Sequence, residues 1–344
     1  MSTPEGVFAS LLKRLAAGER LSAVESADAF GAMMAGTVSE MRMAAFLTAL
    51  AVRSPSVAEI AGAARAMRAA MTTVDAPVGA IDVCGTGGDG QGTLNVSTAA
   101  AFVVAACGVP VAKHGNRAMS SRTGAADVLE ALGVPVALDA EAARESLFGP
   151  GFAFLFAPAY HPAMKHVAPV RRDLGFRTVF NLLGPICNPA RVRRQLMGIF
   201  SAEWLEPVAH VLKDLGTEKA WVVHGEDGLD ELTTTGVTRV AILERGQVRL
   251  VEVTPEDAGL PRTTLAALKG GTAEENARAI RDLLAGAKSA FRDIVLLNAA
   301  AALMVADKAT SLADGAARAA KAIDSGAARK ALEQSMTANL AQAT

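Results

Sequence analysis

The sequence predicts an α/β protein, with a small all-helical N-terminal domain before a larger α/β domain whose mainly parallel central sheet is flanked by helices. Residues 1 to about 72 carry apolar side chains at helical spacing. After them, short apolar runs alternate with helical stretches, a pattern typical of βαβ units. We expect residues 1–75, joined by part of 160–190, to form the helical domain, and residues 76–344 to form the α/β domain.

Length, composition and charge favour a globular protein of two domains. The 344 residues are 51% apolar, so a buried core can form. The 34 Lys+Arg nearly balance the 35 Asp+Glu, which argues against a dedicated binder of nucleic acid or anionic membranes. Three cysteines without a CxxC pair favour a reducing compartment. No stretch has the pattern of a secretory signal or a membrane span, so we expect a cytoplasmic location.

The N-terminal segment carries two capping-box sequences. Ser22 stands three residues before Glu25, and Ser56 three residues before Glu59. In a capping box each of the two side chains accepts a hydrogen bond from a free backbone N–H at the start of a helix. Helices are therefore expected to begin directly after Ser22 and Ser56.

The α/β part is predicted from apolar runs of strand length. Five runs are expected to be strands: IDVCG (81–85), VPVAKHG (109–115), FAFLF (152–156), QLMGIF (195–200) and KAWVVHG (219–225). Helices are expected between them, including 98–107, 122–132 and 205–215. Two alternating runs within 237–253 flank Arg245-Gly246 and predict a hairpin. A capping box at Thr272–Glu275 begins an Ala-rich helical segment that continues to the C-terminus.

The stretch GTGGDGQGTLNVST (85–98) is rich in glycine, which loses more backbone freedom on folding than other residues. It follows a strand and leads into a helix beginning near Ser97, where free backbone N–H groups favour an anion. It matches neither the nucleoside-triphosphate nor the dinucleotide fingerprint. Asp89 would repel phosphate unless it holds a metal ion or a sugar hydroxyl. We predict a cradle for a phosphorylated sugar; the alternative is a tight turn capped by Ser97.

A second loop of phosphate-binding residue types follows the next strand, in KHGNRAMSSRTGAADVLEALG (113–133). Its candidates are cationic, amide or hydroxyl side chains: Lys113, Asn116, Arg117, Ser120 and Ser121. One such loop alone is commonly a solvated basic turn. Two of them after two strands of one sheet indicate a ligand with phosphate groups at two ends.

Adjacent acids occupy a third loop, HGEDGLDEL (224–232), which also follows a strand. Asp230 and Glu231 offer hard oxygen ligands that suit Mg²⁺, which binds phosphates through one or two carboxylates. Adjacent surface acids are usually only solvated. The two anion cradles would need charge compensation, which favours a metal site here.

In this order the motifs resemble the anthranilate phosphoribosyltransferase family. The matching stretches, over roughly residues 5–340, are GTGGDGQGTLNVST, KHGNRAMSS with GAADVLEALG, HPAMKHVAPVRRDLGFRTVFNLLGP and GLDEL. The resemblance implies a nucleoside phosphorylase/phosphoribosyltransferase-like fold. It implies transfer of the phosphoribosyl group of 5-phosphoribosyl 1-pyrophosphate (PRPP) to the amine of anthranilate, the second step from chorismate in L-tryptophan biosynthesis. It further implies two Mg²⁺ ions per subunit, a homodimer and an association with anthranilate synthase.

The resemblance also assigns roles to residues by motif. PRPP would be bound by residues of the first two loops: Gly85, Gly88, Asp89, Thr93, Asn95, Val96, Ser97, Thr98, Lys113, His114, Gly115, Asn116, Arg117, Ala118, Met119, Ser120, Ser121 and Ala125. Anthranilate would be bound by Gly85, Asn116 and Arg171, the last on a helix over 161–173. The metal ligands would be Ser97, Asp230 and Glu231. As catalytic residues, Lys113 would stabilise the departing pyrophosphate and His114 would receive the proton of the amine.

Two positions depart from the pattern of the family. Ala125 stands where a serine is common, so a hydroxyl that could reach pyrophosphate is missing and only the backbone N–H remains. We expect a weakened contact there. Cys187, in LGPICNP, stands where threonine is common, and we expect it to be a neutral packing residue.

Two other functions fit parts of the pattern. A pyrimidine nucleoside phosphorylase would share the architecture and a similar glycine loop, but would normally carry a further C-terminal domain. A non-catalytic relative that binds nucleic acid would need a basic groove and decayed motifs. The intact motifs and the net charge of −1 favour the transferase, with PRPP and anthranilate as its partners and neither nucleic acid nor membrane.

Overall fold

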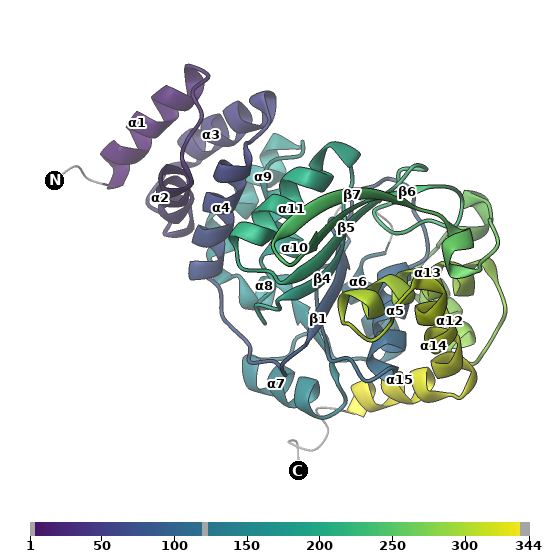
Figure 1. Cartoon of the computed structure of the whole chain (residues 1–344). Coiled ribbons are helices and arrows are strands. Elements are labelled where there is room, and N and C mark those ends of the chain that lie inside the picture. Colours follow the sequence, from purple (N-terminus) through teal and green to yellow (C-terminus); the bar gives the residue numbers. More distant parts are fainter. Residues whose placement is uncertain (1–3, 119–122, 338–344) are drawn as a thin grey trace, which may run out of the picture.

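The computed structural model describes residues 4–118 and 123–337 (Figure 1). Its first four helices gather at one end of the molecule: α1 (Pro4–Ala16), α2 (Ala23–Met34), α3 (Glu40–Arg53) and α4 (Val57–Ala69). Both predicted capping boxes are confirmed, because the hydroxyl of Ser22 or Ser56 accepts from the third helical N–H and the glutamate there accepts from the serine N–H.

One seven-stranded sheet, in the order β3-β2-β1-β4-β5-β6-β7, forms the centre of the α/β part. The strands are β1 (Ile81–Gly85), β2 (Val111–Gly115), β3 (Phe152–Phe156), β4 (Arg194–Gly198), β5 (Lys219–Gly225), β6 (Thr238–Glu244) and β7 (Gln247–Val253). The first five strands are mutually parallel. β6 runs antiparallel to β5, and β7 runs antiparallel to β6. The mainly parallel sheet and the hairpin at Arg245-Gly246 are therefore confirmed.

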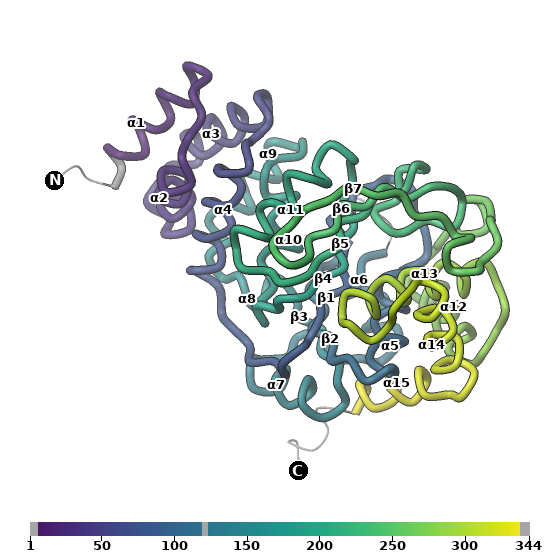
Figure 2. The backbone as a smooth tube through the Cα atoms, in the orientation of Figure 1, coloured from purple at the N-terminus to yellow at the C-terminus, as the bar shows by residue number. Residues whose placement is uncertain are grey.

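Different parts of the chain cover the two faces of the sheet. One face packs on six helices: α5 (Val96–Ala106), α6 (Ala125–Leu132), α12 (Ala273–Leu284), α13 (Ala290–Val305), α14 (Leu312–Asp324) and α15 (Ala327–Thr337). The other face packs on α10 (Phe180–Ile186), α11 (Leu205–Asp214) and the N-terminal helices. Successive strand residues alternate between the two cores, as Leu196 and Met197 do. Figure 2 shows the N-terminal helices and α12–α15 on opposite sides of the molecule.

Several short helices connect these elements. They are α7 (Ala140–Phe148) beside β3, and the 3-10 turns η2 (Ala202–Trp204), η3 (Pro255–Ala258) and η4 (Leu265–Leu268). The helical segment expected after residue 272 is four separate helices, α12 to α15. None of the described helices has the length and apolar character needed to cross a membrane.

The single helix predicted over residues 161–173 is wrong. The chain forms α8 (Ala157–Tyr160), the 3-10 turn η1 (Pro162–His166) and α9 (Ala168–Leu174). Prolines lie in the first turn of η1 and of α9, where the missing N–H costs nothing, but they cannot continue a helix that has already begun. Together with α10 these pieces pack on α2, α3, α4 and β2. The division of the chain at residues 75 and 76 stays a prediction.

Candidate active site

Three predicted loops meet at the carboxyl edge of the sheet, beyond the ends of β1, β2 and β5. The Asp230 carboxylate accepts a hydrogen bond from the backbone N–H of Gly87 at 2.6 Å. The Glu231 carboxylate accepts one from the N–H of Ser97 at 3.0 Å, and Lys113 Nζ donates to Ser97 Oγ at 3.1 Å. The structure thus brings the glycine loop, the end of β2 and the acid pair together.

Two glycines provide the space for the acid pair. Gly85 ends β1 and lies opposite Gly198 of β4. A Cβ on Gly85 would lie 2.4 Å from Asp230 Oδ2, and one on Gly198 would lie 1.5 Å from the Asp230 carbonyl oxygen. The acid loop can approach the strands only because both positions lack a side chain. Asn298 of α13 holds the end of the acid loop: its Oδ1 accepts from Leu232 N at 3.0 Å, and its Nδ2 donates to Leu232 O at 2.8 Å.

The start of α5 follows the prediction only in part. Its N-cap is Asn95 and Ser97 lies inside the helix, so the alternative of a tight turn capped by Ser97 is wrong. Val96 and Thr98, both predicted to contact PRPP, are 2% and 1% exposed. Val96 belongs to the apolar core, so only its backbone is available to a ligand. Within the described residues, the Thr98 hydroxyl has no hydrogen-bond partner.

The glycine loop between β1 and α5 is held in shape by its own residues and by a neighbouring segment. Asp89 accepts from the N–H of Gln91 at 3.0 Å, and Thr93 forms an isolated bridge with Lys269. Gly88 has a φ of +73°, and its carbonyl oxygen accepts a hydrogen bond from the Arg177 guanidinium. Asp89 also lies close enough to Asp230 for its negative charge to raise the pKa of that carboxyl.

Lys113 is the buried cation of the site. It is 1% exposed, and its Nζ donates to Val83 O at 2.6 Å as well as to Ser97. Burial raises the pKa of Glu231 to about 7, although the positive charge of Lys113 lowers it. Burial, followed by repulsion from Asp89 and Glu231, raises the pKa of Asp230 well above its usual range. Three carboxylates thus share the site with one buried lysine, whose charge acts on Glu231, and a bound cation would relieve the remaining repulsion among them.

His114 is held as a neutral imidazole. Its Nδ1 lies 2.8 Å from Gly184 O, and its Nε2 lies 3.3 Å from Nε2 of His161. Burial lowers the pKa of His114 to about 3 and that of His161 to about 4. Because so weak a base is a poor acceptor for the proton of the amine, the low pKa favours a positioning role for His114, and its catalytic role stays a prediction.

The loop after β2 folds back on α6 through Asp127. This carboxylate accepts from Ala118 N at 3.1 Å and from Gly124 N at 2.9 Å, and a Cβ on Gly124 would lie 2.3 Å from Ala118 N. Arg117, predicted to bind phosphate, instead pairs with Asp127 at 3.0 Å and with Glu130 at 2.5 Å. Its positive charge is paired there, and its contact with phosphate stays a prediction.

For the remaining candidates of the second loop, the structure gives their position in the chain and their exposure. Gly115 ends β2, Asn116 is exposed, and Ala125 is the first residue of α6. Met119, Ser120 and Ser121 lie outside the described residues. Cys187, expected to be a packing residue, is fully buried among the apolar residues that join the N-terminal helices to the sheet.

Arg171 lies on α9, half-buried, with its guanidinium 5.3 Å from the centre of the Phe180 ring. It has no ion-pair partner among the described residues, and burial lowers its pKa. An unpaired, partly desolvated guanidinium is suited to bind a carboxylate. On the same segment Arg177 donates to Gly88 O and lies 4.4 Å from the Phe200 ring centre, which ties this segment to the glycine loop.

Sequence reasoning missed a buried polar network beneath the site. Asp82 of β1 accepts from Asn188 Nδ2 at 2.7 Å and from the N–H of His114 at 3.1 Å. Burial raises its pKa to about 6, although these hydrogen bonds and the charge of Lys113 lower it. The signal was an acid inside the apolar strand IDVC, since a buried carboxylate needs partners.

The site fits Mg²⁺ by the chemistry of its donors. Over residues 4–118 and 123–337, no group of three or more His, Cys, Asp or Glu side chains is arranged to hold a metal ion without other ligands. Mg²⁺ commonly binds through one or two carboxylates and completes its shell with water and phosphate oxygens. Asp230 and Glu231, with raised pKa values and the Ser97 hydroxyl nearby, provide such a partial set.

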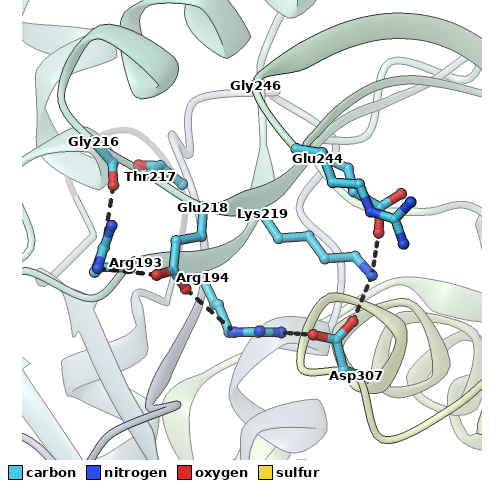
Figure 3. Close-up of a pocket in the computed structure, with 10 residues that line it drawn as sticks. Arg193, Arg194, Gly216, Thr217, Glu218, Lys219, Glu244, Gly246 and Asp307 are labelled. Atoms are coloured by element: carbon cyan, nitrogen blue, oxygen red, sulfur yellow. Dashed lines mark hydrogen bonds and ion pairs between the residues drawn. The ribbon is translucent and has the colours of Figure 1, made fainter.

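A cavity of about 650 Å³ lies at the other edge of the sheet, at the amino ends of β4 and β5 (Figure 3). Its charged side chains neutralise one another: Asp307 pairs with Arg194 at 2.5 Å and with Lys219 at 2.8 Å, and Glu244 also pairs with Lys219. Arg194 further donates to the carbonyl of Val305 at 2.7 Å. This cluster fastens the end of α13 to the sheet and is far from the predicted chemistry.

Comparison with known proteins identifies the family. Residues 78–329 match the model of the glycosyl transferase family a/b domain, and residues 9–71 match that of the glycosyl transferase family helical bundle domain. The anthranilate phosphoribosyltransferase of Parvibaculum lavamentivorans is 56% identical over 331 residues, which is 96% of this chain and 97% of that protein. The chain belongs to the anthranilate phosphoribosyltransferase family. The resemblance seen in the sequence motifs is thereby confirmed.

Solved structures of this family have the same fold. The anthranilate phosphoribosyltransferase of Thermus thermophilus superposes with a TM-score of 0.90 at 48% identity, over 95% of this chain and 98% of that one. The Saccharomyces cerevisiae enzyme in complex with PRPP and Mg gives 0.89 at 29% identity, over 97% and 98%. The yeast enzyme has also been solved in complex with 4-fluoroanthranilate. The predicted fold class is confirmed.

Proposed function

We propose that this family member transfers the phosphoribosyl group of PRPP to the amine of anthranilate, giving N-(5-phosphoribosyl)anthranilate and pyrophosphate. The observation that carries the proposal is the junction at the carboxyl edge of the sheet. There the acid pair binds the backbone of the glycine loop and Lys113 binds Ser97. The identity of 56% to an enzyme of this name over nearly the whole chain supports it.

PRPP would lie along the glycine loop and the end of β2. The backbone N–H groups of the loop and the start of α5 would bind its phosphates, and Lys113 would face the departing pyrophosphate. Asp230, Glu231 and the Ser97 hydroxyl would hold Mg²⁺, two ions in each subunit. Mg²⁺, when bound, would neutralise charge on the pyrophosphate. This assignment explains why three carboxylates lie close to one another in the site.

Anthranilate would bind with its carboxylate on Arg171. The aromatic amine is neutral at pH 7, so its attack on the anomeric carbon requires alignment more than a strong base. Positioning alone can contribute about 7 kcal/mol or more to a well-aligned reaction. The contact of Arg177 with Gly88 joins the segment that carries Arg171 to the glycine loop, which supports such alignment.

The reaction is tested by following anthranilate fluorescence with purified protein, PRPP and Mg²⁺, leaving out each component in turn. Loss of fluorescence only in the complete mixture is the expected result. Intact fluorescence in the complete mixture, from a protein that melts cooperatively, would contradict the proposal. Release of base from thymidine and phosphate would instead favour the nucleoside phosphorylase function.

Two pairs of variants test the site residues. Arg171→Gln should raise the KM for anthranilate, whereas Arg172→Gln, on the same helix and exposed, should not. An unchanged KM in Arg171→Gln would remove Arg171 from the site. Asp230→Asn with Glu231→Gln should abolish activity at limiting Mg²⁺, whereas the exposed Glu226→Gln in the same loop should retain it. Full activity of the double variant would refute the metal assignment.

The homodimer, the association with anthranilate synthase and the cytoplasmic location stay predictions. Sedimentation of the purified protein tests the first. Co-purification with anthranilate synthase tests the second, and fractionation of cells tests the third.

A further inference from the structure

A closed ring of hydrogen bonds joins the two loops proposed to hold PRPP. Asn276 Nδ2 donates to Asn95 Oδ1 at 2.8 Å, and Gly271 N donates to Asn276 Oδ1 at 2.8 Å. Thr123 Oγ1 donates to Gly271 O at 2.9 Å, and Asn95 Nδ2 donates to Thr123 O at 3.5 Å. The ring therefore runs from the first loop through the start of α12 to the second loop and back.

The ring decides which way the Asn95 amide faces. The backbone N–H of Gly271 can only donate, so the atom of Asn276 that faces it must be the carbonyl oxygen. The amide nitrogen of Asn276 is then the group that faces Asn95, which must present its own oxygen. Asn95 consequently turns its NH₂ group toward Thr123 and the second loop.

Asn276 is not needed to cap its own helix. The capping box of α12 is already complete, formed by Thr272 and Glu275. Asn276 is nevertheless 1% exposed, although an asparagine is rarely buried without a polar task. Its only side-chain partners among the described residues are Gly271 and Asn95. Its burial is explained by the ring and by nothing else in α12.

The segment that carries Asn276 is pressed against the glycine loop. Leu94 N donates to Leu268 O, and Gly270 N donates to Gly92 O, both at 2.9 Å. A Cβ on Gly270 would lie 2.6 Å from the carbonyl oxygen of Thr93. The segment from η4 to α12 thus holds the glycine loop in place from its own side of the contact.

We propose that Asn276 is a positioning residue for PRPP. It orients the Asn95 amide and fixes the spacing between the glycine loop and the loop after β2, without touching the ligand. The inference rests on the proposed function, since it assumes that both loops bind one molecule of PRPP. It adds a residue 181 positions away from Asn95 in the sequence to the machinery of the site.

Asn276→Asp tests the proposal because it keeps the shape of the side chain and its acceptor but removes the donor to Asn95. Since it also adds a negative charge, it is compared with Thr123→Val, which breaks the ring without adding charge. An aspartate can still accept from Gly271 N, but it cannot donate to Asn95 Oδ1, so the Asn95 amide must turn over. We expect the Kd for PRPP, measured calorimetrically with Mg²⁺, and its KM to rise about tenfold, the effect of one lost hydrogen bond. The KM for anthranilate should stay within about twofold.

Ile280→Ala is the matched control, since Ile280 is fully buried on the same helix and its side chain is purely apolar. It should lower the thermal midpoint at least as much as Asn276→Asp while leaving the Kd for PRPP unchanged. Thr123→Val removes the opposite bond of the ring without adding charge and should weaken PRPP binding in the same direction, and it also serves if Asn276→Asp does not fold. Loss of affinity in Asn276→Asp alone would assign the effect to the added charge and overturn the inference.

Two further results would overturn the inference, and they differ from failure of the proposed function. An unchanged Kd for PRPP in Asn276→Asp would reduce Asn276 to a structural residue. An equal loss of affinity in Ile280→Ala would assign the effect to stability. If the unmodified protein itself binds no PRPP, the proposed function fails and the inference with it.

Discussion

Replacing Gly85 by alanine tests whether the acid pair depends on the space that this glycine leaves. A Cβ at this position would lie 2.4 Å from Asp230 Oδ2, whereas ordinary contact begins at 3.4 Å. The difference requires the carboxylate to move by about 1 Å. The same oxygen accepts the N–H of Gly87 at 2.6 Å, so this movement also releases the glycine loop.

Moving the Asp230 carboxylate by this distance should lower the rate strongly and the stability only slightly. Misplacing a group by about 1 Å can lower a rate about 100-fold. We therefore expect Gly85→Ala to lower kcat/KM for PRPP about 100-fold and to raise the Mg²⁺ concentration that gives half-maximal rate. The thermal midpoint should change little, because the half-buried Asp230 side chain at the rim of the sheet can turn away without opening the core.

Initial rates over a grid of PRPP and Mg²⁺ concentrations, with thermal unfolding by circular dichroism, measure both expectations. Gly31→Ala is the control, since a Cβ at Gly31 in α2 meets nothing within 4 Å. Gly85→Ala with an unchanged response to Mg²⁺ and unchanged kcat/KM would refute the view that this glycine positions Asp230.

Three further predictions follow from the same contacts. Gly198→Ala would place a Cβ 1.5 Å from the Asp230 carbonyl oxygen, which is backbone and cannot turn away, so we expect no folded protein in the soluble fraction; a cooperative melt would contradict this. Lys113→Met removes the hydrogen bonds to Val83 and Ser97, so kcat should fall about 100-fold in an initial-rate assay. It also removes the cation that lowers the pKa of Glu231, so activation by Mg²⁺ should require a higher pH. Burial lowers the pKa of His161 to about 4, below its ordinary 6.5, so its contribution to stability is full above pH 6.5 and is lost as the pH falls toward 4. The free energy of unfolding, measured with urea, should fall between pH 7 and pH 5 by about 2 kcal/mol less in His161→Gln than in the unmodified protein. An equal fall in the two proteins would refute the assignment.

Elements with local determinants could be predicted from the sequence. The capping box at Thr272–Glu275 forms as expected because its two residues need only each other and the helix start between them. Strand-length apolar runs predicted the strands to within two residues. The prediction of one helix over 161–173 was wrong because a new helical element begins at Pro162 and another just before Pro169. The two prolines are a local signal that outweighs the apolar spacing.

The support of the site could not be predicted, because its contacts join distant segments. Asn188 lies 106 residues from Asp82, and Asn276 lies 181 residues from Asn95. No spacing in the sequence relates such pairs, and Gly198 looks like any glycine at a strand end until Asp230 is placed beside it. Motifs could therefore indicate which loops bind the ligand, but not which buried residues hold those loops in place.

The central claim is that the acid pair and the glycine loop hold the metal and PRPP at the carboxyl edge of the sheet. Crystals grown with Mn²⁺ and PRPP, with the metal located by anomalous scattering, test it most directly. We predict anomalous density beside Asp230 and Glu231, with the pyrophosphate between the metal and Lys113. Metal and PRPP at the opposite edge, beside the Arg194 and Lys219 cluster of Figure 3, would contradict the account.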